Sequence, residues 1–187
     1  MATLAALALA APADAARPEM AFDGRCDVYG DVIFRDRVTT EVIENPFAFR
    51  TADRLTTCAG TIRIGERTLA SKTRPFRVVV KSTGQVSCQN STADGLRGKL
   101  ILLKRKKGQV FKPRVIRGHR VQLRTTISLE HVLNSVVAQI AGAAGSTAEA
   151  RATFFPTPEA IERCGEDGIR TLPFNGTVVT QGELISE

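Results

Sequence analysis

The stretch HRVQLRTTISL, residues 119–129, decides the fold class, because its side chains alternate between two chemical kinds. One set is mainly apolar and the other is polar or charged: Val121, Leu123, Thr125, Ile127 and Leu129 against Arg120, Gln122, Arg124, Thr126 and Ser128. Successive side chains of a β-strand point to opposite faces of its sheet, so a period of two indicates one buried and one solvated face. We therefore expect a half-buried strand whose outer face carries two arginines.

Short segments with strand-like composition occupy most of the chain, and Gly, Pro and Asn residues punctuate them. They cover residues 27–34, 38–43, 55–64, 75–82, 85–89, 99–103, 109–116, 169–174 and 176–180. Many short strands separated by turns are typical of all-β proteins. The sequence thus predicts a mainly β fold, a single antiparallel β-sandwich or barrel.

Residues 129–140 are ambiguous between helix and strand. A helical stripe would consist of Leu129, Val132, Leu133, Val136, Val137 and Ile140. The Val-rich composition and the small residues that follow also suit two strands joined by a Gly-rich turn. Periodicity alone favours a helix slightly.

One short helix is expected near the C-terminus, in PTPEAIERCGEDG, residues 156–168. Thr157 is a good N-cap, Pro158 suits the first helical position, and Glu159 places a carboxylate in the first turn. Gly165 could close the helix. Cys164 then falls in the last turn, where a disulfide could hold so short a helix in place.

The chain is 187 residues long and 43% hydrophobic, which suits one domain, expected over residues 21–187. Residues 1–20 are interpreted as a signal-peptide remnant or a disordered tail. Leu4–Ala11 is a short apolar run, and Ala13-Asp-Ala15 matches the small-x-small rule of signal peptidase, although no Lys or Arg precedes the run. The run is too short to span a bilayer, so we expect a secreted or cell-envelope protein without a transmembrane segment.

The four cysteines, Cys26, Cys58, Cys88 and Cys164, lie far apart and form no CxxC pair, which argues against a zinc or thioredoxin-type site. After an export leader, an even count predicts two disulfides. Of the three possible pairings we favour Cys26–Cys58, on early segments that could be neighbours. Cys88–Cys164 would then tie the late helix back to the sheet. Four buried reduced thiols are the alternative.

The positive charge is concentrated in residues 95–129, which hold eleven Lys and Arg and no acid, in a chain of net charge +7. The segment KRKKG, residues 104–108, contains the Gly that a hairpin turn needs. The anion-binding candidates are Lys104, Arg105, Lys106, Lys107, Lys112, Arg114, Arg117, Arg120 and Arg124. A solvated edge hairpin, in which Lys prevents edge-to-edge aggregation, is the alternative.

The charge pattern also limits the class of partner. No RNP, zinc-finger or basic-zipper pattern accompanies it, and Phe111 is its only ring, so sequence-specific nucleic-acid binding is not expected. An exported protein meets anionic cell-wall polymers and lipid headgroups, and these are the partners we expect.

Two other functions are weaker alternatives. A barrel could carry a small apolar ligand, with Leu100, Leu102, Val121, Leu123 and Ile127 pointing inward. A hydrolase-type enzyme could use Asp27 and Asp31, which share one face of a strand. His119 and His131 lack a third metal ligand and no G-x-S-x-G elbow is present, so no metal, cofactor or catalytic residue is expected.

The order of motifs resembles an uncharacterised group of small secreted β-rich proteins of high-GC bacteria with paired cysteines. The shared elements are Cys26 with Gly30, TCAGT (57–61), VSC (86–88), GLRGKL (95–100), a Gly/Ala-rich segment (141–147) and a Pro-x-x-x-Ile-x-x-Cys helix (158–165). The resemblance implies a secreted β fold without a known site. It also implies strands, not a helix, over residues 132–155.

Overall fold

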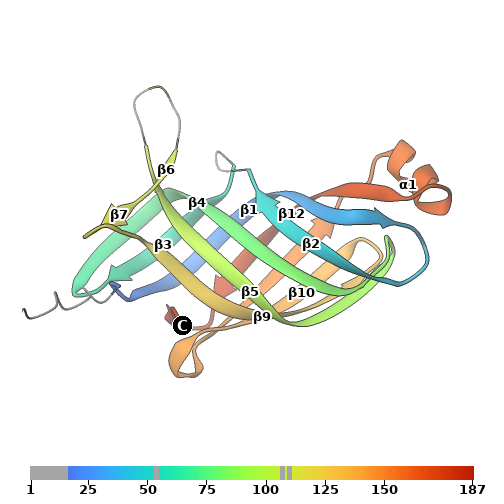
Figure 1. Ribbon diagram of the computed structural model, residues 1–187. Helices are drawn as coiled ribbons and strands as arrows, with labels where there is room; N and C mark the ends of the chain where they lie inside the picture. Colours follow the sequence, from blue (N-terminus) through green and yellow to red (C-terminus); the bar gives the residue numbers. More distant parts are fainter. Residues whose placement is uncertain (1–16, 53–54, 106–107, 109–110) are drawn as a thin grey trace, which may run out of the picture.

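The computed structural model describes residues 17–52, 55–105, 108 and 111–187, without the side chains of residues 71 and 72 (Figure 1). Strands make up 71% of the described residues and helices 7%. The prediction of a mainly β, single antiparallel fold with one short helix near the C-terminus is confirmed. Of the two architectures expected, the structure is the barrel.

Eight antiparallel strand positions close the barrel, and further short strands extend it. The elements are β1 (Met20–Val38), β2 (Ile43–Thr51), β3 (Thr57–Ile64), β4 (Arg67–Val86), β5 (Asn90–Lys104), β6 (Lys112–Pro113), β7 (Val115–Ile116), β8 (His119–Arg120), β9 (Gln122–Val132), β10 (Ser135–Ala141), η1 (Ala143–Gly145), β11 (Thr147–Phe154), α1 (Pro158–Gly165), β12 (Ile169–Thr180) and β13 (Leu184–Ile185). The wall runs β1-β12-β11-β10-β9-β5-β4. It closes because β2 and β3 both pair with β1 and with β4, along different stretches of those strands.

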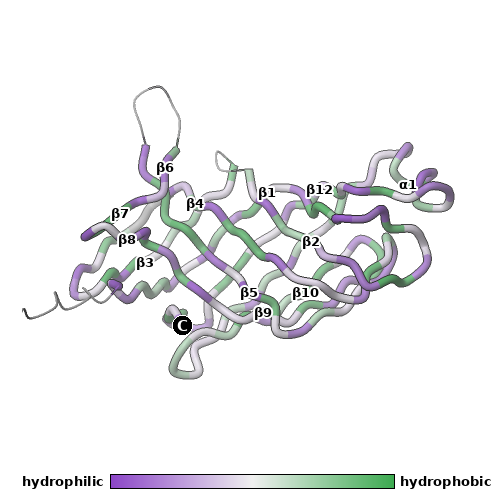
Figure 2. Tube along the Cα trace, viewed as in Figure 1, coloured by the Kyte–Doolittle hydropathy of each residue, from purple (hydrophilic) through white to green (hydrophobic). Residues whose placement is uncertain are grey.

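Residues 119–129 form β8, which pairs with β7 in a separate two-stranded sheet, and most of β9, which lies in the wall between β5 and β10. Their predicted inner set is buried throughout, from Val121 and Leu123 at 1% exposure to Leu129 at 8%. Figure 2 shows hydrophilic and hydrophobic residues alternating along the strands in the same way. The alternation is therefore the pattern of a barrel wall with an apolar inside.

The helix that periodicity favours slightly over residues 129–140 is wrong, and the strands that the resemblance implies over residues 132–155 are confirmed as β10 and β11. The end of β9 and the whole of β10 form a hairpin there, with Val132 paired to Ser135 and Leu129 to Ala138. Val136, Ala138 and Ile140 face the core, while Val137 is 39% exposed. The sequence resembles a helical stripe because β10 carries a valine on each face, Val136 and Val137. Its pairing with β9 and β11 makes the segment a strand.

The predicted helix is confirmed as α1. Its N-cap Thr157 accepts a hydrogen bond from the Ala160 amide (3.2 Å), and Pro158 opens the first turn. Gly165 lies within the helix, and the glycine with left-handed backbone is Gly168 (φ 79°), whose amide donates to the Arg163 carbonyl. In Figure 1, α1 lies at the end of the barrel opposite β6 and β7.

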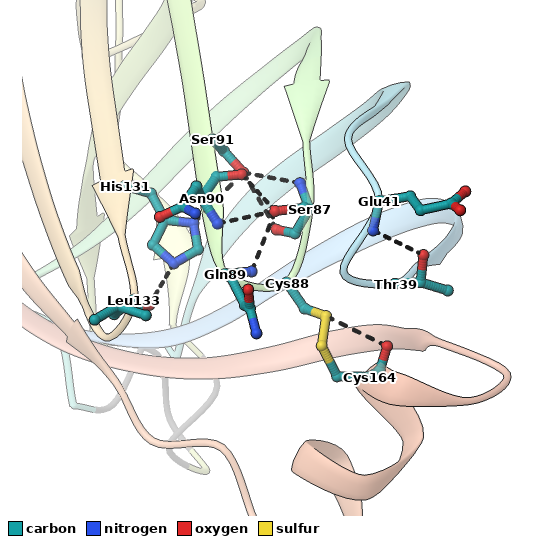
Figure 3. Close-up of a disulfide and its surroundings, with 10 residues drawn as sticks. All are labelled: Thr39, Glu41, Ser87, Cys88, Gln89, Asn90, Ser91, His131, Leu133 and Cys164. Carbon is teal, nitrogen blue, oxygen red and sulfur yellow. Dashed lines mark hydrogen bonds between the residues drawn. A yellow bond between two sulfur atoms is a disulfide. The ribbon is translucent and has the colours of Figure 1, made fainter.

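Both disulfide pairings expected from the sequence are present, and no cysteine is free. Cys26 and Cys58 lie directly opposite each other on β1 and β3, with a Cα–Cα distance of 4.0 Å. Cys88, in the connection from β4 to β5, holds Cys164 of α1 (Figure 3). Disulfides form and persist in oxidising compartments, so the frame fits a protein that works outside the cytoplasm.

The barrel interior is filled by side chains. Leu102, Val121, Leu123 and Ile127 are buried as expected, and Leu100 is partly buried against the same core. Among the described residues, two apolar voids inside the barrel measure about 90 Å³ and about 40 Å³. Pockets that hold drug-sized ligands measure about 300–1,000 Å³. The carrier hypothesis therefore gains no support from the interior.

The expected boundary at residue 20 coincides with the start of β1, whose first residue Met20 is fully buried. The apolar run of the expected leader lies outside the described residues. Within the part of the chain that the structure describes, no helix is long and apolar enough to cross a membrane.

Candidate functional site

An open groove of about 680 Å³ lies at the end of the barrel away from α1. Strands β3 and β4 form one wall, and β5 with the start of the β5–β6 connection forms the other. The polar residues that line it are Thr57, Thr73, Arg74, Lys104, Arg105 and Arg114. Among its described lining residues four are cations and none is acidic, so we call this feature the basic groove.

The register of the strands brings Arg74 to Lys104, although 30 residues separate them in the chain. Strand β4 pairs with β5 so that Phe76 lies opposite Leu102. Two residues further along each strand, the antiparallel register leads to Arg74 and Lys104. Because residues two apart in a strand share a face, both side chains lie on the same face as the buried Phe76 and Leu102, at the end of that row, and both line the basic groove.

Arg74 is unusual because its Nε atom is buried and makes no hydrogen bond. Buried donors in folded proteins are almost always paired. Leaving one unpaired costs about 1–3 kcal/mol, and more for a charged group. Arg74 also lines the basic groove, so an anionic oxygen there would supply the missing acceptor if a small shift of the side chain opened Nε to the groove.

A second unfavourable feature lies on the β5–β6 hairpin. Lys104 and Lys112 are directly opposite each other across the two strands. Like charges in that position destabilise a strand pair. Both side chains are exposed, so solvent and salt weaken the repulsion, but an anion bound beside Lys104 would reduce it further.

The structure brings only some of the predicted anion-binding residues together. Lys104, Arg105 and Arg114 line the basic groove, and Lys112 lies next to Lys104. Lys106 and Lys107 lie outside the described residues. The predicted hairpin is confirmed at its base, where β5 pairs with β6.

The other three predicted cations lie elsewhere. Arg120 and the turn residue Arg117 belong to the separate β7–β8 hairpin. Arg124 lies on the outer wall in β9, where its backbone amide donates to Ser186 Oγ (3.0 Å) and its carbonyl accepts from the Glu187 amide (3.1 Å). Arg124 therefore adjoins the C-terminal residues and does not line the groove.

Sequence reasoning missed Arg74, because it precedes the basic block and lies in a different strand. Thr57 and Thr73, whose hydroxyls could donate to the same ligand, were missed for the same reason. The available signal was the expected strand over residues 75–82, which begins next to Arg74. Its pairing partner could not be read from the sequence.

The two aspartates of the enzyme hypothesis do not converge. Asp27 and Asp31 are exposed on the outer face of β1, and Asp27 forms an ion pair with Arg25 (3.4 Å). Four residues of extended strand separate them by about 13 Å. Carboxylate pairs of glycoside hydrolases lie about 5–9.5 Å apart. The hydrolase hypothesis gains no support from this geometry.

His131 is a core residue with a structural environment. It is 5% exposed, and its Nε2 lies 2.5 Å from the Leu133 carbonyl oxygen (Figure 3). Its ring meets Phe154 edge to face. Burial lowers the pKa of His131, more than the hydrogen bond to Leu133 raises it. Within the described residues, no three His, Cys, Asp or Glu side chains gather as a metal site.

A comparison of the chain with known protein families, with curated proteins and with solved structures finds no match. The evidence for the candidate site is therefore its geometry alone. An open groove with four cations, two hydroxyls and one unpaired buried donor can bind phosphate, sulfate or carboxylate groups.

Proposed function

We propose that the protein is a secreted or cell-envelope, non-enzymatic β-barrel module that binds anionic polymers through the basic groove. The observation that carries the proposal is the convergence of Arg74, Lys104, Arg105 and Arg114 on one open groove, with the Arg74 Nε unpaired. Guanidinium groups suit phosphate and carboxylate oxygens because their donors form a planar fork.

A polymer fits this surface better than a single anion. The groove is open to solvent, and Lys112 of the same hairpin adds positive charge beside it. Exposed single ion pairs contribute little, about 0–1 kcal/mol each. A chain of repeated anionic groups could bind several cations at once, and each ion pair would release counterions.

The chemistry of the groove favours an anionic cell-wall polymer. Phe111 is the one ring among its described lining residues, whereas single-stranded nucleic acids are usually held by several stacked rings. The disulfides fit an extracytoplasmic location, where such polymers occur. A membrane surface with anionic headgroups would offer similar charges.

The test is retention on immobilised poly(glycerol phosphate) and on heparin at increasing salt. The variant Arg74→Gln/Lys104→Gln/Arg114→Gln should elute at lower salt. Its binding should also depend less steeply on salt, by roughly one power for each anionic group that the variant no longer neutralises. The matched control Arg35→Gln/Lys81→Gln/Arg170→Gln removes the same charge from exposed positions outside the groove.

The control should elute close to the wild type. Equally early elution of both variants would show that net charge, and not the groove, retains the protein. Vesicles with and without anionic lipid separate the two sources of anions, because a headgroup site would retain the protein on anionic vesicles in preference to the polymer.

A further inference from the structure

A second pocket, of about 380 Å³, lies at the opposite end of the barrel. Its floor contains Phe154, Ile169 and Leu172 from the wall, and its rim contains Ile161 of α1 and Leu133 of the β9–β10 turn. We call it the helix-end pocket. It is independent of the basic groove and of the function proposed for that groove.

The helix over this pocket is held mainly by a covalent bond, because beside Cys164 only the small Ala160 packs against the core. Cys164 is the one buried residue of α1, and it is bonded to Cys88 (Figure 3). Ile161 remains 61% exposed, although it lines the pocket. The disulfide thus keeps α1 beside a space that the helix does not fill.

Leu133 provides an independent observation. Its backbone is left-handed (φ 54°), a conformation that Gly or Asn normally supplies because a β-carbon is crowded there. The conformation is held from both sides, since the Leu133 carbonyl accepts from His131 Nε2 (2.5 Å) and its amide donates to the Gln89 carbonyl (2.6 Å). The fold therefore fixes a 63% exposed leucine at the mouth of the pocket.

The lining specifies the chemistry of a ligand. None of its described residues is charged, in contrast to the basic groove. Thr40, Gln89 and Asn134 lie at the solvent side, and their side chains make no hydrogen bond within the described residues. A ligand could place an apolar body against the floor and an uncharged polar group among these three side chains.

We propose that the helix-end pocket binds a small, uncharged, mainly apolar molecule. The volume decides between a small molecule and a macromolecule, because it falls within the range of about 300–1,000 Å³ that small ligands occupy. The exposed Leu133 and Ile161 then become two sides of the entrance. An apolar ligand bound between these two side chains would cover their exposed apolar surface.

The test is titration of the full chain with N-phenyl-1-naphthylamine, an uncharged apolar dye that fluoresces out of water. Binding should saturate at one dye per protein. Ala160→Trp, which fills the pocket from α1, and Ile161→Ser, which removes one side of the entrance, should each weaken binding about tenfold or more. Urea unfolding of both variants verifies that they are folded.

The matched control is Val115→Ser, which removes an exposed apolar side chain at the other end of the barrel. It should bind the dye like the wild type, and so should Arg74→Gln, which tests the basic groove separately. Equal dye binding in all variants, or no saturation in the wild type, overturns the proposal. So does a dimer that Ile161→Ser converts to monomer, since a second copy would then cover the pocket.

Discussion

Removal of the Cys88–Cys164 disulfide should destabilise the protein more than removal of Cys26–Cys58. The two bonds span 76 and 32 residues of sequence. In the chain-entropy model, a disulfide stabilises by restricting the unfolded chain, and more so when the loop is longer. For these separations the model gives about 4.5 and about 3.7 kcal/mol, a difference of about 0.8 kcal/mol.

The native state affects the two variants differently. Cys26 and Cys58 are buried in the barrel wall, where strand pairing keeps their positions without the bond. Cys164 belongs to a helix with no other buried residue, so α1 has less to hold it once the bond is gone. Detachment of α1 would make the measured destabilisation smaller than the loop length predicts.

The assay is urea unfolding of Cys88→Ala/Cys164→Ala and Cys26→Ala/Cys58→Ala, followed by circular dichroism because the chain has no Trp. Reduced wild type is the control that keeps every side-chain volume. Hydrogen exchange of residues 158–168 reports whether α1 stays docked. The reasoning is refuted if α1 keeps its protection and the Cys88–Cys164 variant is destabilised no more than the Cys26–Cys58 variant.

Three further predictions concern stability. Burial lowers the pKa of His131, whereas an unfolded histidine titrates near pH 6.5, so the unfolded state binds more protons below that pH. The free energy of unfolding should fall as pH drops below about 6.5, and His131→Gln should lose that part of the slope in urea titrations between pH 5 and 7.5. Gly60→Ala should lower the free energy of unfolding by more than about 2 kcal/mol, because a β-carbon there would lie 2.1 Å from the Asp23 carbonyl oxygen. Gly65→Ala, in open space at φ 56°, should lower it by only about 1 kcal/mol. Similar losses for the two variants in thermal unfolding would contradict this. Thr157→Ala removes the cap of α1 and should cost about 1 kcal/mol, whereas Thr157→Ser should retain most of it.

Much of the wall could be predicted because alternation is a local property. Residues 119–129 show it in their own composition, and the structure buries the expected face. Local alternation could not decide between a sandwich and a barrel. Closure depends on β1 pairing with β12, for example Arg25 with Val179, and such a partner across the whole chain leaves no local signal.

The groove was predictable only in part for the same reason. Lys104, Arg105 and Arg114 belong to a charge block that is visible in the sequence. Arg74 joins them because β4 pairs with β5 in one particular register. A shift of one residue would move the Arg74 side chain to the opposite face of the wall. The residue with the strongest evidence for ligand binding is thus the one that required the structure.

The barrel interior is filled by side chains, and it separates two ends of different chemistry. Arg74 and its neighbours collect positive charge at one end, whereas Leu133 and Ile161 present apolar surface at the other. Distant substitutions without shared partners usually act additively, to within about 0.3–0.5 kcal/mol. A variant that combines Arg74→Gln with Ile161→Ser should therefore weaken polymer retention and dye binding by the same factors as the single variants. Coupling between the two effects would mean that the wall transmits strain from one end to the other.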